Sequence, residues 1–280
     1  MKYSIKKTAG FTLIEVMITV LLSLMLTFAT SQVLITSNKS ASSTDGLSQA
    51  QETGRFVMSF LASHIREAGS DEIVDLKDGE VAGDPVTTIP FIDCYTHTDL
   101  KNVDKVGIAC STDTNNGYAA GGAFNAGDHL AVAWVPPVPL DNSAPPKEDP
   151  SLIRDCTGVG GYAKNDIILN VFWVQPPTLK DPADSNSTGT PGSLWCQGLT
   201  LKESKITRFN APQSIATGID AMHVLYGEAF DDLSGVDQLR NTTKYVSAKN
   251  VQKWDHVYAV RVAILSSAST GSGNTEDTVY

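Results

Sequence analysis

The residue with the clearest chemical consequence is Glu15, because it is the only formally charged side chain between Lys7 and Lys39. It lies near the start of an apolar run that continues to about Ile35. A helix rises about 1.5 Å per residue, so this run reaches roughly 38 Å and can cross a bilayer core of about 30 Å. An ionised carboxylate in such a segment is costly unless a partner neutralises it. We therefore expect Glu15 to pair with a cationic group.

The segment before the apolar run is basic and ends in Gly10-Phe11. An ordinary secretory signal has a small-residue cleavage site after its apolar region, but no A-x-A sequence follows this run. Processing between Gly10 and Phe11 would instead leave an N-terminal amine at Phe11, about one helical turn before Glu15. The amine of one copy would then neutralise the carboxylate of a neighbouring copy inside a bundle.

All four cysteines follow the apolar run, at Cys94, Cys110, Cys156 and Cys196. In an exported domain an even count predicts two disulfides, for which three connectivities exist. We favour Cys94 with Cys110 and Cys156 with Cys196, because pairing along the chain closes two separate loop-rich insertions. No spacing resembles a CxxC metal site, which argues against zinc. A reduced, buried set is the remaining alternative.

The formal net charge of −10 hides an asymmetry between the leader and the body. Residues 1–10 contain three lysines and no acid, so their removal changes the charge from −10 to −13. Basic residues before the span and an acidic body after it place the N-terminus in the cytoplasm and the body outside. The acidic body argues against a broad phosphate-binding surface, so no nucleic-acid partner is expected.

Residue types that serve catalysis are scattered along the chain. The five histidines accompany no Gly-x-Ser-x-Gly elbow, P-loop or His-Glu-x-x-His motif. The sequence therefore predicts a protein that is not an enzyme and has no catalytic residues. These histidines are His64, His97, His129, His223 and His256.

One acidic loop suggests a calcium site, and the sequence predicts no other cofactor. Its oxygen ligands cluster around a glycine, as in calcium loops, but the twelve-residue spacing and the closing glutamate are missing. The alternative is a solvated acidic turn between two strands. A millimolar calcium titration that left thermal stability unchanged would exclude the site. The candidate ligands are Asp231, Asp232, Ser234 and Asp237.

The elements that position these residues begin with one long helix, predicted from about Thr12 to Ala68. The polar patch at 37–45 contains no proline, so the helix continues through it. Beyond it, Val57 and Leu61 belong to an apolar stripe that predicts packing on a globular body. Gly69 supplies the C-terminal cap.

Strands are predicted at 129–135, 167–174, 219–227 and 254–266, where short apolar, β-branched and aromatic runs occur. In the last run, one face carries His256, Tyr258, Val260, Val262 and Ile264, and we expect this face to pack on the helix. Turn-rich segments, including a proline-rich loop at 136–150 and a polar loop at 180–192, separate the strands. The predicted fold is α+β, with a long N-terminal helix packed on an antiparallel sheet that carries loop-rich insertions.

The N-terminal pattern of a short basic leader, Gly10 and then Phe11-Thr12-Leu13-Ile14-Glu15 closely resembles the class III signal of type IV pilins and type II secretion pseudopilins. This resemblance implies cleavage after Gly10 by prepilin peptidase and N-methylation of Phe11. It also implies that Glu15 guides assembly into a helical filament.

Two further segments resemble minor pilins of the PilW type. One is Gln49-Ala50-Gln51-Glu52-Thr53-Gly54-Arg55-Phe56, continuing to an R-x-AG ending at Gly69. The other is the pair of strand patterns at 219–227 and 254–265. PilW-like chains are thought to belong to the complex that primes and caps a type IV pilus. Arg55 and Arg66 have two interpretations. They either contact a partner protein or are solvated charges on the helix surface, and the second interpretation is favoured.

The resemblance implies a division of the chain into five parts. These are a cleaved leader at 1–10, a transmembrane and filament-core helix at 11–35, the second half of the helix at 36–69, a globular β-rich domain at 70–265 and a flexible tail at 266–280. The implied location is the bacterial inner membrane before assembly and the extracellular pilus afterwards. The implied partners are other minor pilins, the major pilin, prepilin peptidase, the inner-membrane assembly platform and a tip adhesin.

Two alternatives stay open from the sequence. A minor pseudopilin of type II secretion, of the GspJ kind, shares the leader and part of the topology. A binding or adhesion module at the pilus tip would instead use the large insertion at 70–192 to recognise a surface or ligand.

Overall fold

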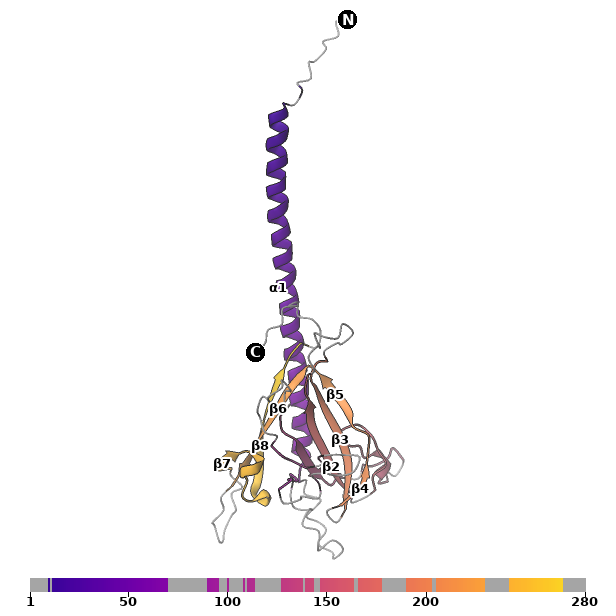
Figure 1. The fold of residues 1–280 in the computed structure, drawn as a ribbon. Helices are drawn as coiled ribbons and strands as arrows, with labels where there is room; N and C mark the ends of the chain where they lie inside the picture. The colour runs from indigo at the N-terminus through magenta and orange to yellow at the C-terminus, as the bar shows by residue number, and fades with distance from the viewer. Residues whose placement is uncertain are drawn as a thin grey trace, which may run out of the picture. The chain divides into compact units, whose positions relative to one another are not determined.

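The computed structural model describes the helical region and most of the strands. The described residues are Gly10, 12–69, 90–95, 100, 108, 110–113, 127–137, 139–143, 147–163, 166–177, 190–202, 205–229 and 242–268. The chain divides into two compact units, one made of Met1–Ser48 with Thr270–Tyr280 and the other of Gln49–Ser269. Helix α1, Leu13–Glu67, supplies residues to both units without interruption (Figure 1).

Helix α1 begins and ends within one residue of its predicted limits. The polar patch at 37–45 is helical throughout, because it contains neither proline nor a competing turn. At the C-terminal end, Gly69 adopts a left-handed conformation with φ of 64°. This conformation is easy for glycine and ends the helix, as the sequence predicted.

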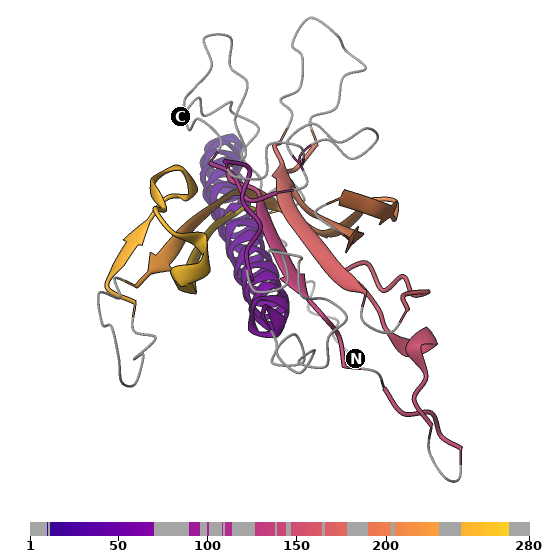
Figure 2. The same cartoon turned by 90° about the horizontal axis from the view of Figure 1, so that it is seen from below.

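In the larger unit, the inner face of α1 lies in the main hydrophobic core. Val57 and Leu61 are fully buried, and they belong to a cluster with side chains from both sheets, including Phe172 and Val257. The smaller sheet, with the yellow strands, and the larger sheet lie on the two sides of this part of the helix (Figure 2). The helix is therefore the element that joins the two sheets into one core.

The larger sheet has five antiparallel strands in the order β1-β2-β3-β4, with β5 also paired to β3. Two of its strands were predicted from the sequence, at 129–135 and 167–174. The other three were missed, because β3 interrupts its apolar residues with Gln197 and Gly198, and β4 and β5 are short and polar. The bounds are β1 Leu130–Trp134, β2 Ile167–Gln175, β3 Ser193–Lys202, β4 Lys205–Phe209 and β5 Gln213–Thr217.

The smaller sheet has three antiparallel strands in the order β7-β6-β8. These are β6 Ile219–Glu228, β7 Lys244–Val246 and β8 Val257–Ser266. Short 3-10 helices precede β8 at Ala248–Asn250 and at Trp254–His256, so β8 starts three residues later than predicted.

The predicted packing face of β8 is correct along most of the strand. Val260, Val262 and Ile264 pack against the main core. The register shifts where Gly227 and Glu228 meet the start of β8, and an irregularity of this kind changes which side chains face inward. Val257 is therefore buried and Tyr258 is 37% exposed, which corrects the prediction for Tyr258.

Close backbone contact at Gly127 connects the segment before β1 to β6. Gly127 has φ of 100°, and a Cβ atom there would lie 1.9 Å from the carbonyl oxygen of Met222. The next residue continues the contact, because the Asp128 amide donates to Met222 O at 2.8 Å and the Asp128 carboxylate accepts from the Val224 amide at 2.9 Å. Only glycine fits this position.

We predict that Gly127→Ala destabilises the folded chain more than Gly158→Ala. Both glycines have positive φ, so both substitutions carry a backbone cost of about 1–2 kcal/mol. Nothing lies within 4 Å of the position of an added Cβ at Gly158, whereas the Gly127 variant adds an overpacking cost of about 1–3 kcal/mol. Thermal unfolding of the full-length chain in detergent measures the difference, and equal melting temperatures would contradict this account.

Candidate assembly site and disulfide-braced loops

The N-terminal end of α1 has the geometry of a capped helix. Thr12 precedes the first helical residue, and its Oγ1 accepts from the Glu15 amide at 3.4 Å. Thr12 O also accepts from the Val16 amide at 3.3 Å. Glu15 therefore lies in the first turn, where the helix dipole favours a negative charge.

This position of Glu15 in a capped first turn was not predicted, although its signal is present in the sequence. Thr12-Leu13-Ile14-Glu15 has the S/T-x-x-E spacing of a capping box. Glu15 is exposed in the structure, so its carboxylate is open to a second molecule. Gly10 is also exposed, and Phe11 lies outside the described residues, so its processing and methylation stay predictions.

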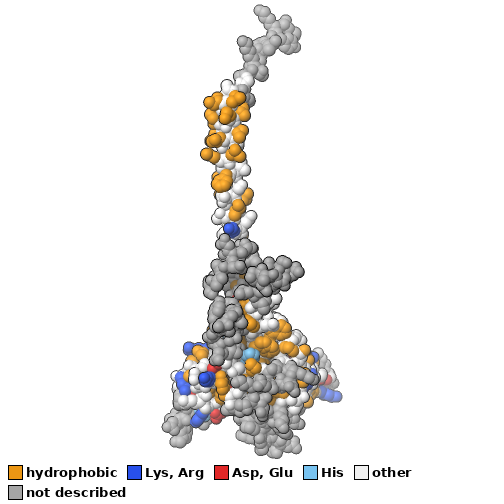
Figure 3. Space-filling model, in the orientation of Figure 1, with side chains coloured by type: hydrophobic (Ala, Val, Ile, Leu, Met, Phe, Trp, Pro, Cys, Tyr) orange, Lys and Arg blue, Asp and Glu red, His pale blue; other side chains and the backbone are white. Residues whose placement is uncertain are grey.

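The first half of α1 presents an apolar surface that the chain does not cover. Its most apolar part has a mean hydropathy of 2.1, and none of that stretch is buried. Orange apolar side chains cover this part of the helix in Figure 3. By length and composition the helix is able to cross a membrane. A surface of this kind requires lipid or other apolar helices around it.

Hydroxyl side chains in the apolar stretch form hydrogen bonds within the helix. Thr27 Oγ1 donates to the carbonyl of Ser23 at 2.7 Å, and Ser31 Oγ donates to the carbonyl of Thr27 at 2.8 Å. Thr19, Ser23 and Thr30 donate to carbonyls three residues earlier in the same way. These hydroxyl groups therefore add little free-energy cost in an apolar environment. Glu15 is the charged side chain in this stretch that still needs a partner.

The structure contains two disulfides, in the pairing that the sequence favoured. Cys94–Cys110 joins Cα atoms 5.1 Å apart, and Cys156–Cys196 joins Cα atoms 6.3 Å apart. No cysteine is free, so the zinc and reduced alternatives do not hold in this structure. The first bond lies in a second hydrophobic cluster with residues of β1, β2 and β3. The second bond lies in the main core that contains α1.

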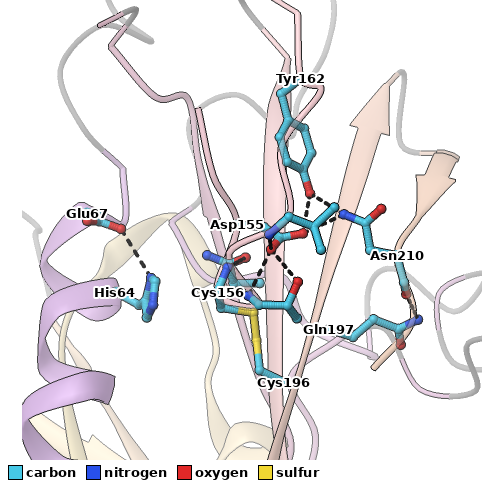
Figure 4. Close-up of a disulfide and its surroundings, with 11 residues drawn as sticks. His64, Glu67, Asp155, Cys156, Tyr162, Cys196, Gln197 and Asn210 are labelled. Atoms are coloured by element: carbon cyan, nitrogen blue, oxygen red, sulfur yellow. Dashed lines mark hydrogen bonds and ion pairs between the residues drawn. A yellow bond between two sulfur atoms is a disulfide. The ribbon is translucent and has the colours of Figure 1, made fainter. Parts of the chain in front are cut away.

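A polar cluster centred on the buried Asp155 lies beside the second disulfide (Figure 4). The Asp155 carboxylate accepts from Tyr162 Oη at 2.6 Å and from Asn210 Nδ2 at 2.6 Å, and it also accepts from the hydroxyl and amide of Thr157. Burial tends to raise the pKa of Asp155, but these hydrogen bonds outweigh burial and hold its pKa below the ordinary value. A Cβ at Gly198 would lie 2.0 Å from this carboxylate. The cluster is therefore a structural brace between the loop at 150–163 and the sheet.

The four histidines that the structure describes do not form a common site. His64 packs on α1 with its ring centroid 4.8 Å from that of Phe60, and the ring of His129 stacks on Trp173 at 6.1 Å. Burial lowers the pKa of His129 to about 4, so its ring is neutral at pH 7. His97 lies outside the described residues. Within the described part of the chain, no three His, Cys, Asp or Glu side chains are grouped to hold a metal ion.

The calcium candidates cannot be placed in this fold. Their loop lies outside the described residues, so calcium binding stays a prediction. Glu228, at the end of β6, is described and is buried. Its carboxylate accepts from the amides of Gln252 and Lys253 and lies 3.0 Å from Lys244 Nζ. This carboxylate therefore anchors the segment that leads into β8.

Two known families match the two ends of the chain. The prokaryotic N-terminal methylation motif matches residues 5–31. The family described as Type IV Pilus-assembly protein W, or PilW, matches residues 183–280. The first match contains the capped start of α1, and the second contains strands β3 to β8. No curated protein and no solved structure matches the chain significantly.

The apolar N-terminal helix with a methylation motif at its start, and the antiparallel sheets packed on its second half, define a type IV pilin, which is a structural protein class rather than an enzyme class. Within this class the two family matches support a PilW-like minor pilin of type IV pili. The resemblance seen in the sequence is thereby confirmed. The motif and the apolar helix support prepilin processing and membrane anchoring.

We predict that His129 makes the folded chain less stable as the pH falls from 6.5 to 4. Its folded-state pKa of about 4 lies below the ordinary 6.5, so its contribution is complete above pH 6.5 and is lost through this window. The loss is about 3 kcal/mol at most. Denaturant unfolding across pH measures it. His129→Phe should remove this slope, whereas His223→Gln, at an exposed position, should retain it. An unchanged slope in His129→Phe would contradict the assignment.

Proposed function

We propose that this minor pilin takes part in the initiating tip complex of a type IV pilus through subunit contacts. The observation that carries the proposal is the uncovered apolar first half of α1, in which the single carboxylate, Glu15, lies exposed in the first turn. A carboxylate on an apolar helix needs an external cation, and the amine of a processed neighbouring subunit has the required charge. The PilW match supports a pilus over type II secretion.

The proposed route begins in the inner membrane. The N-terminus lies in the cytoplasm and the body lies outside, consistent with three lysines before the span. Prepilin peptidase cuts between Gly10 and Phe11 and methylates the new amine at Phe11. The assembly platform then moves the helix from lipid into the filament core. The proposed neighbours are other minor pilins, the major pilin and a tip adhesin.

Glu15 has two roles to separate, helix capping and intermolecular pairing. Glu15→Gln retains the capping-box side chain type but loses the charge. Thr12→Ala removes the Oγ1 acceptor seen in the structure but retains the charge. We predict that Glu15→Gln and Glu15→Ala are cleaved normally but enter pili at least about tenfold less, because loss of one partner from a buried pair costs about 3–5 kcal/mol. We expect Thr12→Ala to have a smaller effect, since a lost cap costs about 0.5–2 kcal/mol.

The measurement is quantitative immunoblotting of sheared pili and of membranes from cells that express each full-length variant. Leader cleavage is read from the mass of the membrane form. Equal incorporation of Glu15→Gln and the unaltered chain would refute intermolecular pairing. Equal losses in Thr12→Ala and Glu15→Gln would assign Glu15 to helix capping alone.

A further inference from the structure

Strand β8 is an edge strand of the smaller sheet, and part of its main chain faces outward from that edge. In the described part of the chain, β8 pairs with β6 alone. On β6, the Val224 amide donates to the Asp128 carboxylate and the Met222 carbonyl accepts from the Asp128 amide, so both groups point away from β8. In an antiparallel ladder, the residues of β8 opposite such groups point their own N–H and C=O away from β6. The N–H and C=O groups of these alternate residues form what we call the open edge, and the residues are Val260, Val262 and Ile264.

The open edge lacks the features with which proteins usually block a free strand. Strand β8 is ten residues long and contains no proline. Its one charged residue is Arg261, whose guanidinium carbon lies 3.9 Å from the centre of the Tyr245 ring. Tyr245 belongs to β7, on the other side of β6, so this charge lies away from the open edge. The register shifts fall near the two ends of the pairing, and the open edge is therefore regular and uncharged from 259 to 265.

The other edge strands of the two sheets are protected. Strand β1 is covered by main-chain hydrogen bonds from residues 90–92. Strand β7 has three residues, and β4 and β5 have five residues each. In addition, β4 carries Lys205 and Arg208. Short length and basic side chains both oppose the addition of a further strand, so β8 is the edge of the described fold that is best suited to accept one.

The hydrophobic core is incompletely covered beside the open edge. A Cβ atom at Gly54 of α1 would lie 3.9 Å from Ile264 Cδ1, so α1 approaches β8 closely there. Met58 lies on the same face of α1, one turn further along, and it is 39% exposed. The side chains of Val260, Val262 and Ile264 pack against the main core but stay partly exposed. A further strand beside β8 would cover these apolar groups.

We propose that the open edge of β8 accepts an extended segment of another protein of the pilus as an additional β-strand. This proposal rests on the proposed assembly function, and it specifies the surface and the chemistry of one subunit contact. The donor is a different protein, because a minor subunit has other pilins as its neighbours. An extended main chain is the partner that matches alternating N–H and C=O groups along a strand edge.

The open edge also defines the composition of the donated segment. From Val260 to Ile264 the edge extends about 13 Å, so the donor needs at least five extended residues. Alternate side chains of this segment point toward α1 and Met58, and we expect them to be apolar. The side chains between them lie on the solvent side of the sheet, next to Arg261 and Leu265, where polar residues are tolerated.

Site-specific photocrosslinking of the full-length chain in piliated cells tests the contact. The Met58→p-benzoyl-phenylalanine variant places the probe beside the open edge, and we expect a covalent adduct with one other pilus protein. The same probe at Phe209, which is 46% exposed on the protected edge strand β4, is the control and should not crosslink to that protein. No adduct from Met58, an adduct with a second copy of this chain, or a crosslink within the chain would overturn the proposal.

The spacing of crosslinks tests whether the partner is a strand. Arg261 and Leu265 are exposed on one side of β8 and lie about 13 Å apart. Probes at these two positions should crosslink to residues about four apart in one segment of the protein that Met58 captures. A helix covers the same distance in about nine residues. A spacing of about nine residues, or crosslinks to unrelated segments, would exclude strand addition.

Proline substitution in the Met58 probe background tests the main-chain hydrogen bonds. Val262→Pro removes an N–H of the open edge and leaves the N–H groups that face β6 in place. We expect the adduct to fall about fivefold, as for the loss of one main-chain hydrogen bond. Val262→Ala shortens the same side chain but keeps the N–H, and it should retain the adduct. An undiminished adduct in a folded Val262→Pro chain would refute the pairing.

Thermal unfolding of the full-length chain in detergent controls for damage to the sheet. Ala263→Pro removes an N–H that faces β6, because successive residues of a strand point their N–H groups to opposite edges. We therefore expect Ala263→Pro to lower the melting temperature more than Val262→Pro does. Equal losses in the two variants would contradict the outward orientation of the Val262 N–H. Non-reducing mobility reports whether each variant has formed its disulfides.

The content of the chain in sheared pili is measured in the same cells, which separates this proposal from the proposed function. Absence of the adduct in cells whose pili contain the chain overturns strand addition alone. An adduct with the expected spacing in a chain that never enters pili overturns the assembly role and retains the contact.

Discussion

The structure depends on an apolar helix surface that the chain leaves uncovered. The first half of α1 has no buried residue in its most apolar part, and its hydroxyl groups bond to its own carbonyls. Its environment must therefore be apolar, either as lipid or as other helices. Glu15 is the exception on this surface, and its position in the first turn provides partial stabilisation from the helix dipole. The proposed transfer of the helix from lipid into a bundle depends on this uncompensated charge.

In the larger unit, two sheets pack on the second half of α1. Missing Cβ atoms allow three of the contacts, at Gly54 against Ser266, at Gly127 against Met222 and at Gly198 against Asp155. The two disulfides then restrain the loop segments that have few large apolar residues. The acidic side chains in this unit serve mainly as hydrogen-bond acceptors for loops, as Asp155 and Glu228 show.

Much of the fold was accessible from the sequence because its signals were local. The limits of α1 follow from an apolar run, a polar cap and Gly69, and β1, β2, β6 and β8 follow from β-branched and aromatic runs. Strand β3 was missed because Gly198 and Gln197 occur in it for reasons that depend on distant residues. Gly198 makes room for Asp155, and Gln197 donates to the carbonyl of Asn210.

The assembly site was predicted in part, because its signals are also local in the sequence. The isolated charge of Glu15 is visible in the sequence, and the capping spacing from Thr12 was also available. The groove that Leu225 of β6 and Arg261 of β8 line together with Asp113 could not be found from sequence patterns, because Asp113 lies more than a hundred residues away from both strands along the chain. The inward and outward sides of β8 could be assigned only up to the register shift near Gly227.

The contact between α1 and β8 has a consequence for the order of folding. These are the first and last regular elements of the described chain, so the part of α1 around Gly54 that meets β8 stays uncovered until residues 257–266 are present. Both disulfides span shorter segments, of 16 and 40 residues, and their cysteines emerge before β8. The two disulfide-closed loops can therefore form early, whereas the main core is completed only when the end of the chain is present. A chain interrupted before β8 lacks the strand that meets Gly54. Only a chain that includes β8 can therefore complete the globular unit.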